Sequence, residues 1–219
     1  LVGADDGHVY RYDAATGRQH WKFRAAPEDR RVLGHGKMIS RWPVRTGVLV
    51  DDGVAYFGAG IFPAEGVFLY AVDAATGKEI WRNDSCGEPS QSRVSPQGYL
   101  LASDTTLYAP MGRASPAAFD RTDGRLINEA FFGKRVGGTY ALLLGDDVYT
   151  GTEQMLAYRG RTREHFASFP GRKMVVHGDT AYLAGEKELA AVDRGRGRTV
   201  HWKVACPCHD SLILSGKVL

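Results

Sequence analysis

Cys206, Cys208 and His209 form the most chemically suggestive stretch of the chain, which reads CPCHD. Two thiols and an imidazole are soft ligands that suit zinc or copper, so these three residues are a candidate metal site. The stretch is one residue shorter than the C-x-x-C-H signature, which argues against covalently attached haem. The alternatives are a simple turn shaped by Pro207, or a strained Cys206–Cys208 link if the protein is exported.

A second set of candidate residues lies in a long polar segment after Trp21. Between Arg24 and Arg45 this segment contains six basic side chains against two acidic ones. Such a patch with an aromatic ring can hold an anionic ligand such as an acidic glycan. Alternatively, it is a solvated loop whose arginines pair with nearby acids. The predicted ligand-binding residues are Arg30, Arg31, His35, Lys37, Arg41 and Trp42.

The elements that must position these residues are repeats. DAATGRQHW at 13–21 recurs as DAATGKEIW at 73–81. Weaker copies follow, so that the anchor positions are 13, 73, 120, 159 and 193, with Arg159 replacing Asp in the fourth copy. Such self-similarity is typical of repeat architectures. The repeat residues are Asp13, Gly17, Trp21, Asp73, Thr76, Gly77, Trp81, Asp120, Gly124, Asp193, Gly197 and Trp202.

Each repeat contains short runs rich in β-branched and aromatic residues, separated by Gly, Asp and Thr turn signals. Four strands per unit predict an all-β chain: a β-propeller of four-stranded antiparallel blades in one domain, 1–219. We expect four whole blades and two partial ones, forming either a fragment of a longer propeller or a closed five-blade ring. The expected blades are 1–24, 44–84, 96–132, 138–170, 172–205 and the partial 210–219, with an insertion at 25–43.

The repeated residues have a structural interpretation. The Asp can accept backbone N–H groups in a tight turn, and the Gly supplies a positive φ. The Trp lies on the following strand, where its large ring can pack between neighbouring blades. We therefore expect the repeat to build the scaffold and function to lie in what departs from it, namely the insertion and CPCHD.

The complete pattern at Ala71, Asp73, Thr76, Gly77 and Trp81 resembles the tryptophan-docking repeat of the PQQ-like, or quinoprotein-dehydrogenase-like, β-propellers. That superfamily includes the quinoprotein alcohol dehydrogenases and the outer-membrane assembly lipoprotein of the Bam complex. The stretch from Trp21 to Val44 is similar to multidomain secreted bacterial proteins, notably those of planctomycetes. The resemblance implies the fold, and one fold hosts many activities.

A quinone cofactor is the activity that this resemblance suggests first. In the dehydrogenases, the resemblance implies PQQ with calcium, a catalytic Asp and a vicinal Cys–Cys disulfide. No adjacent Cys pair exists here, and no Asp or Glu matches that site residue by residue. We therefore predict no cofactor and no catalytic residue, with PQQ and calcium as the alternative.

Composition narrows the classes of partner. The formal net charge of +3 is too small to predict binding to nucleic acid. No apolar run approaches the roughly 18 residues of a transmembrane segment. We expect a non-catalytic binding or scaffolding module of an exported bacterial protein, periplasmic or extracellular. Its expected partners are other domains, proteins or an acidic glycan; the alternatives are a quinoprotein-type oxidoreductase or electron-transfer module, and an outer-membrane assembly scaffold.

Overall fold

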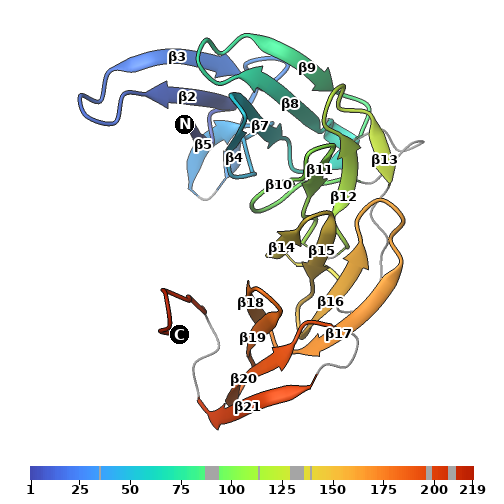
Figure 1. Cartoon of the computed structure of the whole chain (residues 1–219). Coiled ribbons are helices and arrows are strands. Elements are labelled where there is room, and N and C mark those ends of the chain that lie inside the picture. The colour runs from blue at the N-terminus through green and yellow to red at the C-terminus, as the bar shows by residue number, and fades with distance from the viewer. Residues whose placement is uncertain are drawn as a thin grey trace.

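The structure is a computed structural model that describes residues 1–34, 36–86, 94–112, 114–128, 136–138, 140–195, 199–206 and 211–219. Its regular elements are strands and one short 3-10 helix, η1 (Pro63–Glu65). No helix in the described residues is long and apolar enough to cross a membrane. Figure 1 shows the strands grouped into sheets that follow one another around an open arc.

Five of these sheets are propeller blades, in which each strand pairs antiparallel with the next along the chain. Four blades have four strands and the first has three, as the sequence predicts. Blade 1 is β1 (Val2–Gly3), β2 (His8–Tyr12) and β3 (Gln19–Arg24). Blade 2 is β6 (Leu49–Asp51), β7 (Val54–Ala59), β8 (Phe68–Asp73) and β9 (Glu79–Asn83). Blade 3 is β10 (Leu101–Ala102), β11 (Thr106–Ala109), β12 (Ala117–Asp120) and β13 (Leu126–Asn128). Blade 4 is β14 (Ala141–Leu144), β15 (Asp147–Thr150), β16 (Gln154–Arg159) and β17 (His165–Pro170). Blade 5 is β18 (Lys173–His177), β19 (Thr180–Ala184), β20 (Glu188–Asp193) and β21 (Val200–Ala205).

The blades stand side by side with their first strands, such as β14 and β18, toward the inside of the arc (Figure 1). Their last strands, such as β9 and β17, form the outside. The arc does not close: β1 is the edge of its sheet, and in the described residues no strand pairs with its free side. In residues 211–219 the one backbone pairing is the bridge between Ser215 and Val218. Of the two predicted alternatives, the open arc agrees with a fragment of a longer propeller and not with a closed five-blade ring.

Local sequence explains the tight hairpins within a blade. Asp51 pairs with Val54, so Asp52 and Gly53 alone make the turn from β6 to β7. Both have positive φ, 47° and 73°. A two-residue turn of this kind matches the twist of the flanking strands and favours Asp-Gly. The DDG signal in the sequence therefore fixes the register of this hairpin.

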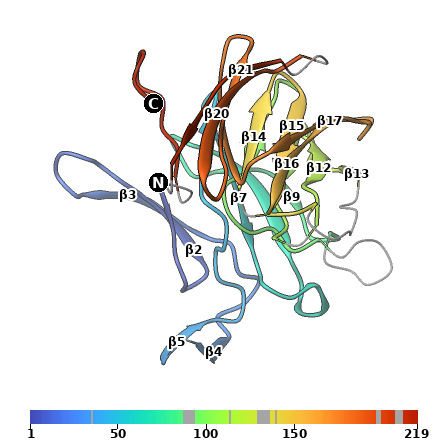
Figure 2. The same ribbon diagram turned by 90° about the horizontal axis from the view of Figure 1, so that it is seen from below.

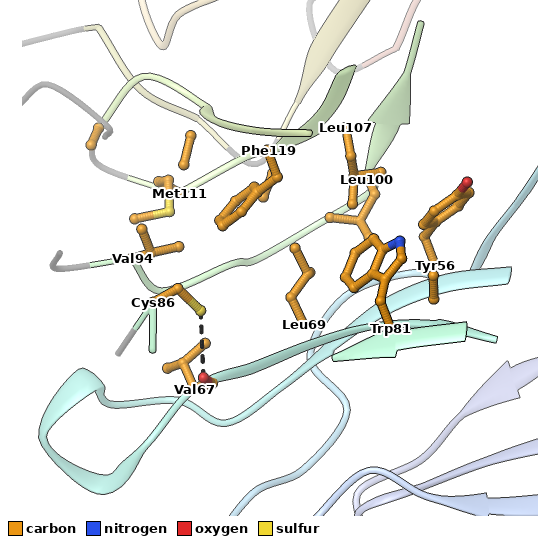
Figure 3. Packing of buried hydrophobic residues seen from close by; sticks show 14 residues of the cluster. Tyr56, Val67, Leu69, Trp81, Cys86, Val94, Leu100, Leu107, Met111 and Phe119 are labelled. Carbon is orange, nitrogen blue, oxygen red and sulfur yellow. Dashed lines mark hydrogen bonds between the residues drawn. The ribbon is translucent and has the colours of Figure 1, made fainter. Parts of the chain in front are cut away.

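The hydrophobic core lies between blades rather than within them. Figure 3 shows Leu69 and Trp81 of blade 2 packed against Leu107 and Phe119 of blade 3. A second cluster joins blades 4 and 5 and includes Phe169. A two-sided sheet of this kind buries its apolar faces only when a neighbour covers them, so each blade depends on the next for stability.

Tyr70 ties the start of the insertion to blade 2 and gives the fold an expected alkaline limit. Its hydroxyl donates to the carbonyl oxygen of Ala25 at 2.9 Å, and burial raises the pKa of Tyr70 to about 12. An unfolded tyrosine ionises near pH 10. Because the folded pKa is the higher one, this contribution to stability is complete below pH 10 and is lost as the pH rises toward 12.

We therefore expect the free energy of unfolding to fall between pH 9 and pH 11 by about 1 kcal/mol more in the wild type than in Tyr70→Phe. Urea unfolding at the two pH values measures the difference. Tyr99→Phe, at a side chain that is 77% exposed, is the control and should fall as the wild type does. An equal fall in Tyr70→Phe would contradict the assignment.

Candidate functional site

The insertion between blades 1 and 2, residues 25–43, folds as a β-hairpin rather than as the irregular loop that the sequence suggested. Its strands are β4 (Arg31–Gly34) and β5 (Lys37–Ser40). Figure 2 shows this insertion hairpin projecting from one face of the arc. The turn contains Gly36 with φ 75°. His35, one of the predicted ligand-binding residues, lies outside the described residues.

The base of the insertion hairpin is fixed to the blades. The amide of Ser40 donates to the carbonyl of Asp5 at 2.7 Å, and the amide of Gly60 donates to that of Pro43 at 3.0 Å. The apolar residues at this base are buried, among them Ala25, Ile39 and Trp42. The hairpin is therefore held rigidly where it leaves the propeller.

Trp42 joins this insertion to the second one, which contains η1. The indole N–H donates to the carbonyl oxygen of Glu65 at 2.6 Å, and the side chain is only 6% exposed. The Arg41 guanidinium lies 3.2 Å from the Glu65 carboxylate and 5.5 Å from the centre of the Trp42 ring. Trp42 and Arg41 therefore hold two loops together, and the ring face is not open to a ligand.

The other predicted basic residues also have acidic neighbours. The distances between charged atoms are 4.0 Å for Arg30–Glu28, 3.3 Å for Arg31–Asp29 and 2.8 Å for Lys37–Asp5. These exposed pairs contribute roughly 0–1 kcal/mol each and can exchange partners. The positive charge of the insertion is locally compensated, so the geometry gives an acidic glycan no concentrated cationic surface.

The tip of the insertion hairpin exposes apolar side chains. Leu33 and Met38 face each other across the two strands and are 77% and 58% exposed. Val32 is 39% exposed, and Phe62, beside η1, is 59% exposed. Leu33 and Met38 are neighbours on one face of this hairpin, and exposed apolar side chains that gather in this way are characteristic of protein interaction sites. The exposed side chains of Leu33 and Met38 can therefore pack against an apolar surface.

Leu33 and Met38 were not among the predicted binding residues, because the prediction rested on the charged side chains of the segment. The signal was present in RVLGHGKMIS, where two apolar pairs flank a Gly-x-Gly turn. Apolar runs on both sides of a short glycine turn predict a hairpin. That pattern would have placed Leu33 opposite Met38.

The repeated turns have the geometry that their sequence suggests. The Asp73 carboxylate accepts bonds from the Thr76 amide at 2.7 Å and the Thr76 hydroxyl at 2.6 Å. The bond from the Thr76 hydroxyl, followed by that from its amide, lowers the pKa of Asp73. Gly77 has φ 74° and donates to the Asp73 carbonyl at 2.8 Å. Asp13, Gly17, Asp120 and Gly124 repeat the backbone part of this turn. Asp193 caps the amide of Gly195 at 2.7 Å, and Gly197 lies outside the described residues.

The first two tryptophans of the repeat each contact the turn of the following blade. The Trp21 indole donates to the carbonyl of Ala74 at 3.2 Å, and the Trp81 indole donates to that of Arg121 at 3.0 Å. In blade 3, Asn128 stands at this position and its amide donates to the carbonyl of Arg161. The three residues therefore connect consecutive blades through equivalent turns.

Trp202 occupies the same register in blade 5. It pairs with Ala191 as Trp81 pairs with Ala71, although its turn is one residue longer. Its ring centre lies 6.2 Å from that of Tyr182, close to the 6.0 Å between Trp81 and Tyr56. Trp202 is nevertheless 39% exposed, against 8% for Trp81. Trp202 is more exposed than Trp81 because, in the described residues, no following blade covers its ring.

The candidate metal site is described only in part. The amide of Cys206 donates to the carbonyl of Lys187 at 2.9 Å, at the end of β21. Cys208 and His209 lie outside the described residues. Within the described ranges, no three His, Cys, Asp or Glu side chains are grouped so as to hold a metal ion. The described residues therefore do not complete the predicted zinc or copper site around Cys206.

The family model described as outer membrane protein assembly factor BamB matches residues 1–204. No curated protein matches the chain. Among solved structures, BamB from Moraxella catarrhalis is 18% identical to this chain, with a TM-score of 0.58. The match covers 94% of this chain and 62% of the Moraxella chain. This chain therefore spans about three fifths of the length of that protein.

Two enzymes with the same architecture are also similar. A europium-containing methanol dehydrogenase is 13% identical with a TM-score of 0.60, covering 90% of this chain and 47% of its own. The quinohemoprotein alcohol dehydrogenase from Comamonas testosteroni is 15% identical with a TM-score of 0.58, and the match covers 88% of this chain and 39% of the dehydrogenase chain. At these identities the likeness shows the fold, a PQQ-like β-propeller.

Proposed function

The chain belongs to the family of the outer membrane protein assembly factor BamB, and from this premise we propose that it is a non-catalytic scaffold that binds protein partners through its blade loops. The observation that supports this function is the apolar tip of the insertion hairpin, where Leu33 is 77% and Met38 58% exposed. A rigid base with an exposed apolar tip loses little conformational entropy on binding. The proposed partner surface is correspondingly apolar.

The specific role that the family name suggests is the assembly of outer membrane proteins. We propose this role for the chain, together with a periplasmic or extracellular location in a bacterium. The insertion hairpin supports a protein partner over an acidic glycan because its apolar side chains are exposed while its basic ones are paired.

A photocrosslinking amino acid at position 33, in the protein expressed in its own bacterium, tests the proposal. We expect a protein adduct that disappears when Met38→Asp is added, because a charge at the tip cannot be buried against an apolar partner without a large desolvation cost. The same crosslinker at Ile80, an outer-strand residue that is 52% exposed, is the control. Equal adducts at both positions, or none at position 33, would refute binding through the hairpin.

A quinoprotein-type oxidoreductase or electron-transfer module is the alternative function. The similar dehydrogenase structures support it at the level of the fold. It requires PQQ and calcium, and among the described residues no three His, Cys, Asp or Glu side chains are grouped to hold a metal ion. Scaffolding is the function that the described side chains support better.

A further inference from the structure

The insertion hairpin has two edges, and blade 1 covers one of them. Along β5, the amide of Ser40 donates to the carbonyl oxygen of Asp5 at 2.7 Å, and the Lys37 ammonium lies 2.8 Å from the Asp5 carboxylate. A Cβ placed on Gly7 would lie 2.8 Å from the Ser40 hydroxyl oxygen, so the turn between β1 and β2 lies directly against β5. The other edge of the hairpin is β4, and Figure 2 shows the hairpin projecting from the arc.

The register of the hairpin directs two residues of β4 outward. Ser40 stands opposite Arg31, so Arg41 stands opposite Arg30. The amide of Arg41 donates to the carbonyl of Arg30 at 2.8 Å, which makes this a hydrogen-bonded pair. Because hydrogen-bonded and non-hydrogen-bonded pairs alternate along an antiparallel ladder, the pairs made by Arg31 and Leu33 are non-hydrogen-bonded ones. The N–H and C=O groups of Arg31 and Leu33 therefore point away from β5, as the outward amide of Ser40 confirms on the other edge.

These outward backbone groups are accessible. In the part of the chain that the structure describes, no backbone group outside the hairpin bonds to Arg31 or Leu33. The side chains along the strand are also exposed: Leu33 by 77%, Val32 by 39% and the side chain of Arg31 by 59%. Unpaired backbone groups on an exposed strand edge are a template for a further strand. Arg31 is the one charged residue of β4, so charge protects this edge only lightly.

We propose that a partner protein adds an extended segment to the edge of β4, as a third strand of the insertion hairpin. The N–H and C=O groups of Arg31 and Leu33 make the backbone hydrogen bonds to this segment, which is a common mode of peptide capture by exposed sheet edges. The inference rests on the proposed function, because it gives the conformation and composition of the partner at the same hairpin.

The side chains of β4 indicate the composition of the segment. Arg31 and Leu33 lie on one face of the hairpin, with Met38 beside Leu33, and Val32 lies on the other face. Directly opposed side chains stabilise a sheet when both are apolar or when their charges are opposite. An antiparallel segment therefore has two successive apolar residues opposite Leu33 and Val32, followed by an acidic residue opposite Arg31. The exposed Arg31–Asp29 pair, 3.3 Å apart, can exchange its acidic partner.

A second copy of this chain matches the edge less well. Antiparallel pairing of β4 with β4 of another copy, if it uses both outward residues, places Arg31 of one copy opposite Leu33 of the other. Neither an apolar pair nor an ion pair results. The segment is therefore one from a different protein, with the composition given above.

NMR titration with a short capped peptide tests the site. In the peptide two valines are followed by a glutamate, with threonine and serine on either side. We expect saturable downfield shifts of the Arg31 and Leu33 amide protons, which gain hydrogen bonds, and almost none of the Val32 amide, which points toward β5. Methyl groups on the peptide nitrogens that face β4, those of the first valine and the glutamate, should weaken binding by about tenfold or more. A methyl group on the second valine, whose nitrogen faces away, is the matched control and should leave binding unchanged.

A pair of variants tests the same edge from the protein side. Arg31→Pro removes an outward N–H and no bond to β5, and proline is tolerated on an edge strand at such a position. It should weaken peptide binding by about tenfold or more, because the proline also blocks the approach of a strand. Arg31→Ala keeps the amide and should weaken binding only about threefold, through the lost ion pair. Unchanged hydrogen exchange of the Val32 amide shows that the hairpin is intact in both variants.

Three results would overturn the strand addition. They are equal binding of the two kinds of methylated peptide, shifts confined to the side chains of Leu33 and Met38, and protection of the Arg31 amide that grows with the concentration of the free protein. The last would identify a second copy as the occupant. All three are measured on the wild type, so they do not depend on the folding of Arg31→Pro.

The crosslinking experiment at position 33 separates this inference from the proposed function. If the protein adduct forms equally well in Arg31→Pro and in the wild type, the hairpin binds its partner through side chains alone. The proposed function then stands and the strand addition is wrong. If no adduct forms in the wild type, the proposed function fails, and the amide shifts with the peptide still decide whether the edge of β4 accepts a strand.

Discussion

Trp81→Ala is expected to lower the free energy of unfolding by about 3–5 kcal/mol, the usual cost of removing a packed tryptophan. The Trp81 side chain is 8% exposed and belongs to the core between blades 2 and 3. Its removal opens a cavity in the packing that Figure 3 shows around Trp81. It also leaves the carbonyl of Arg121 without the indole donor. Urea or guanidinium unfolding followed by circular dichroism measures the change.

Trp202→Ala is the matched control, since it removes the same residue from the same register of another blade. Its side chain is 39% exposed, so it has less packing to lose. We expect a loss below about 1 kcal/mol. Similar losses at the two positions would show that tryptophan stabilises its own blade and not the interface with the next one.

Gly124→Ala is expected to destabilise the protein by about 2–5 kcal/mol, through two separate effects. Gly124 has φ 74°, which costs a residue with a Cβ about 1–2 kcal/mol. The added Cβ would also lie 2.4 Å from Cε3 of Trp81, and displacing a buried ring costs about 1–3 kcal/mol. Thermal and denaturant unfolding of the variant measure the sum.

Gly17→Ala separates the two effects. Gly17 has nearly the same backbone conformation, φ 71°, but a Cβ there would meet nothing within 4 Å. We expect this variant to lose only the conformational part, about 1–2 kcal/mol. If Gly17→Ala were as destabilising as Gly124→Ala, the repeated glycine would serve the turn alone and not the packing of the preceding tryptophan.

The fourth turn supports the second function of the glycine. Arg163 stands in place of Gly and has φ 59°, so the turn keeps its left-handed residue without glycine. The position that faces this turn in blade 3 is Asn128 and not Trp. Where the large ring is absent, a side chain at the glycine position is tolerated.

The architecture was determined by the sequence alone, because it rests on local signals repeated along the chain. The turn at Asp73 and Gly77 and the hairpin at Asp52 and Gly53 depend on neighbouring residues and on backbone conformation. The same local pattern places Trp81 on the strand that follows the turn at Asp73 and Gly77. The open arc was one of two alternatives that these signals allowed.

Only the tertiary structure decided which side chains are available to a partner. It pairs Arg31 with Asp29 and Lys37 with Asp5, and it buries Trp42, while Leu33 and Met38 stay exposed. Exposure and pairing depend on residues that are distant in sequence, and a local pattern contains no information about which of them will face each other.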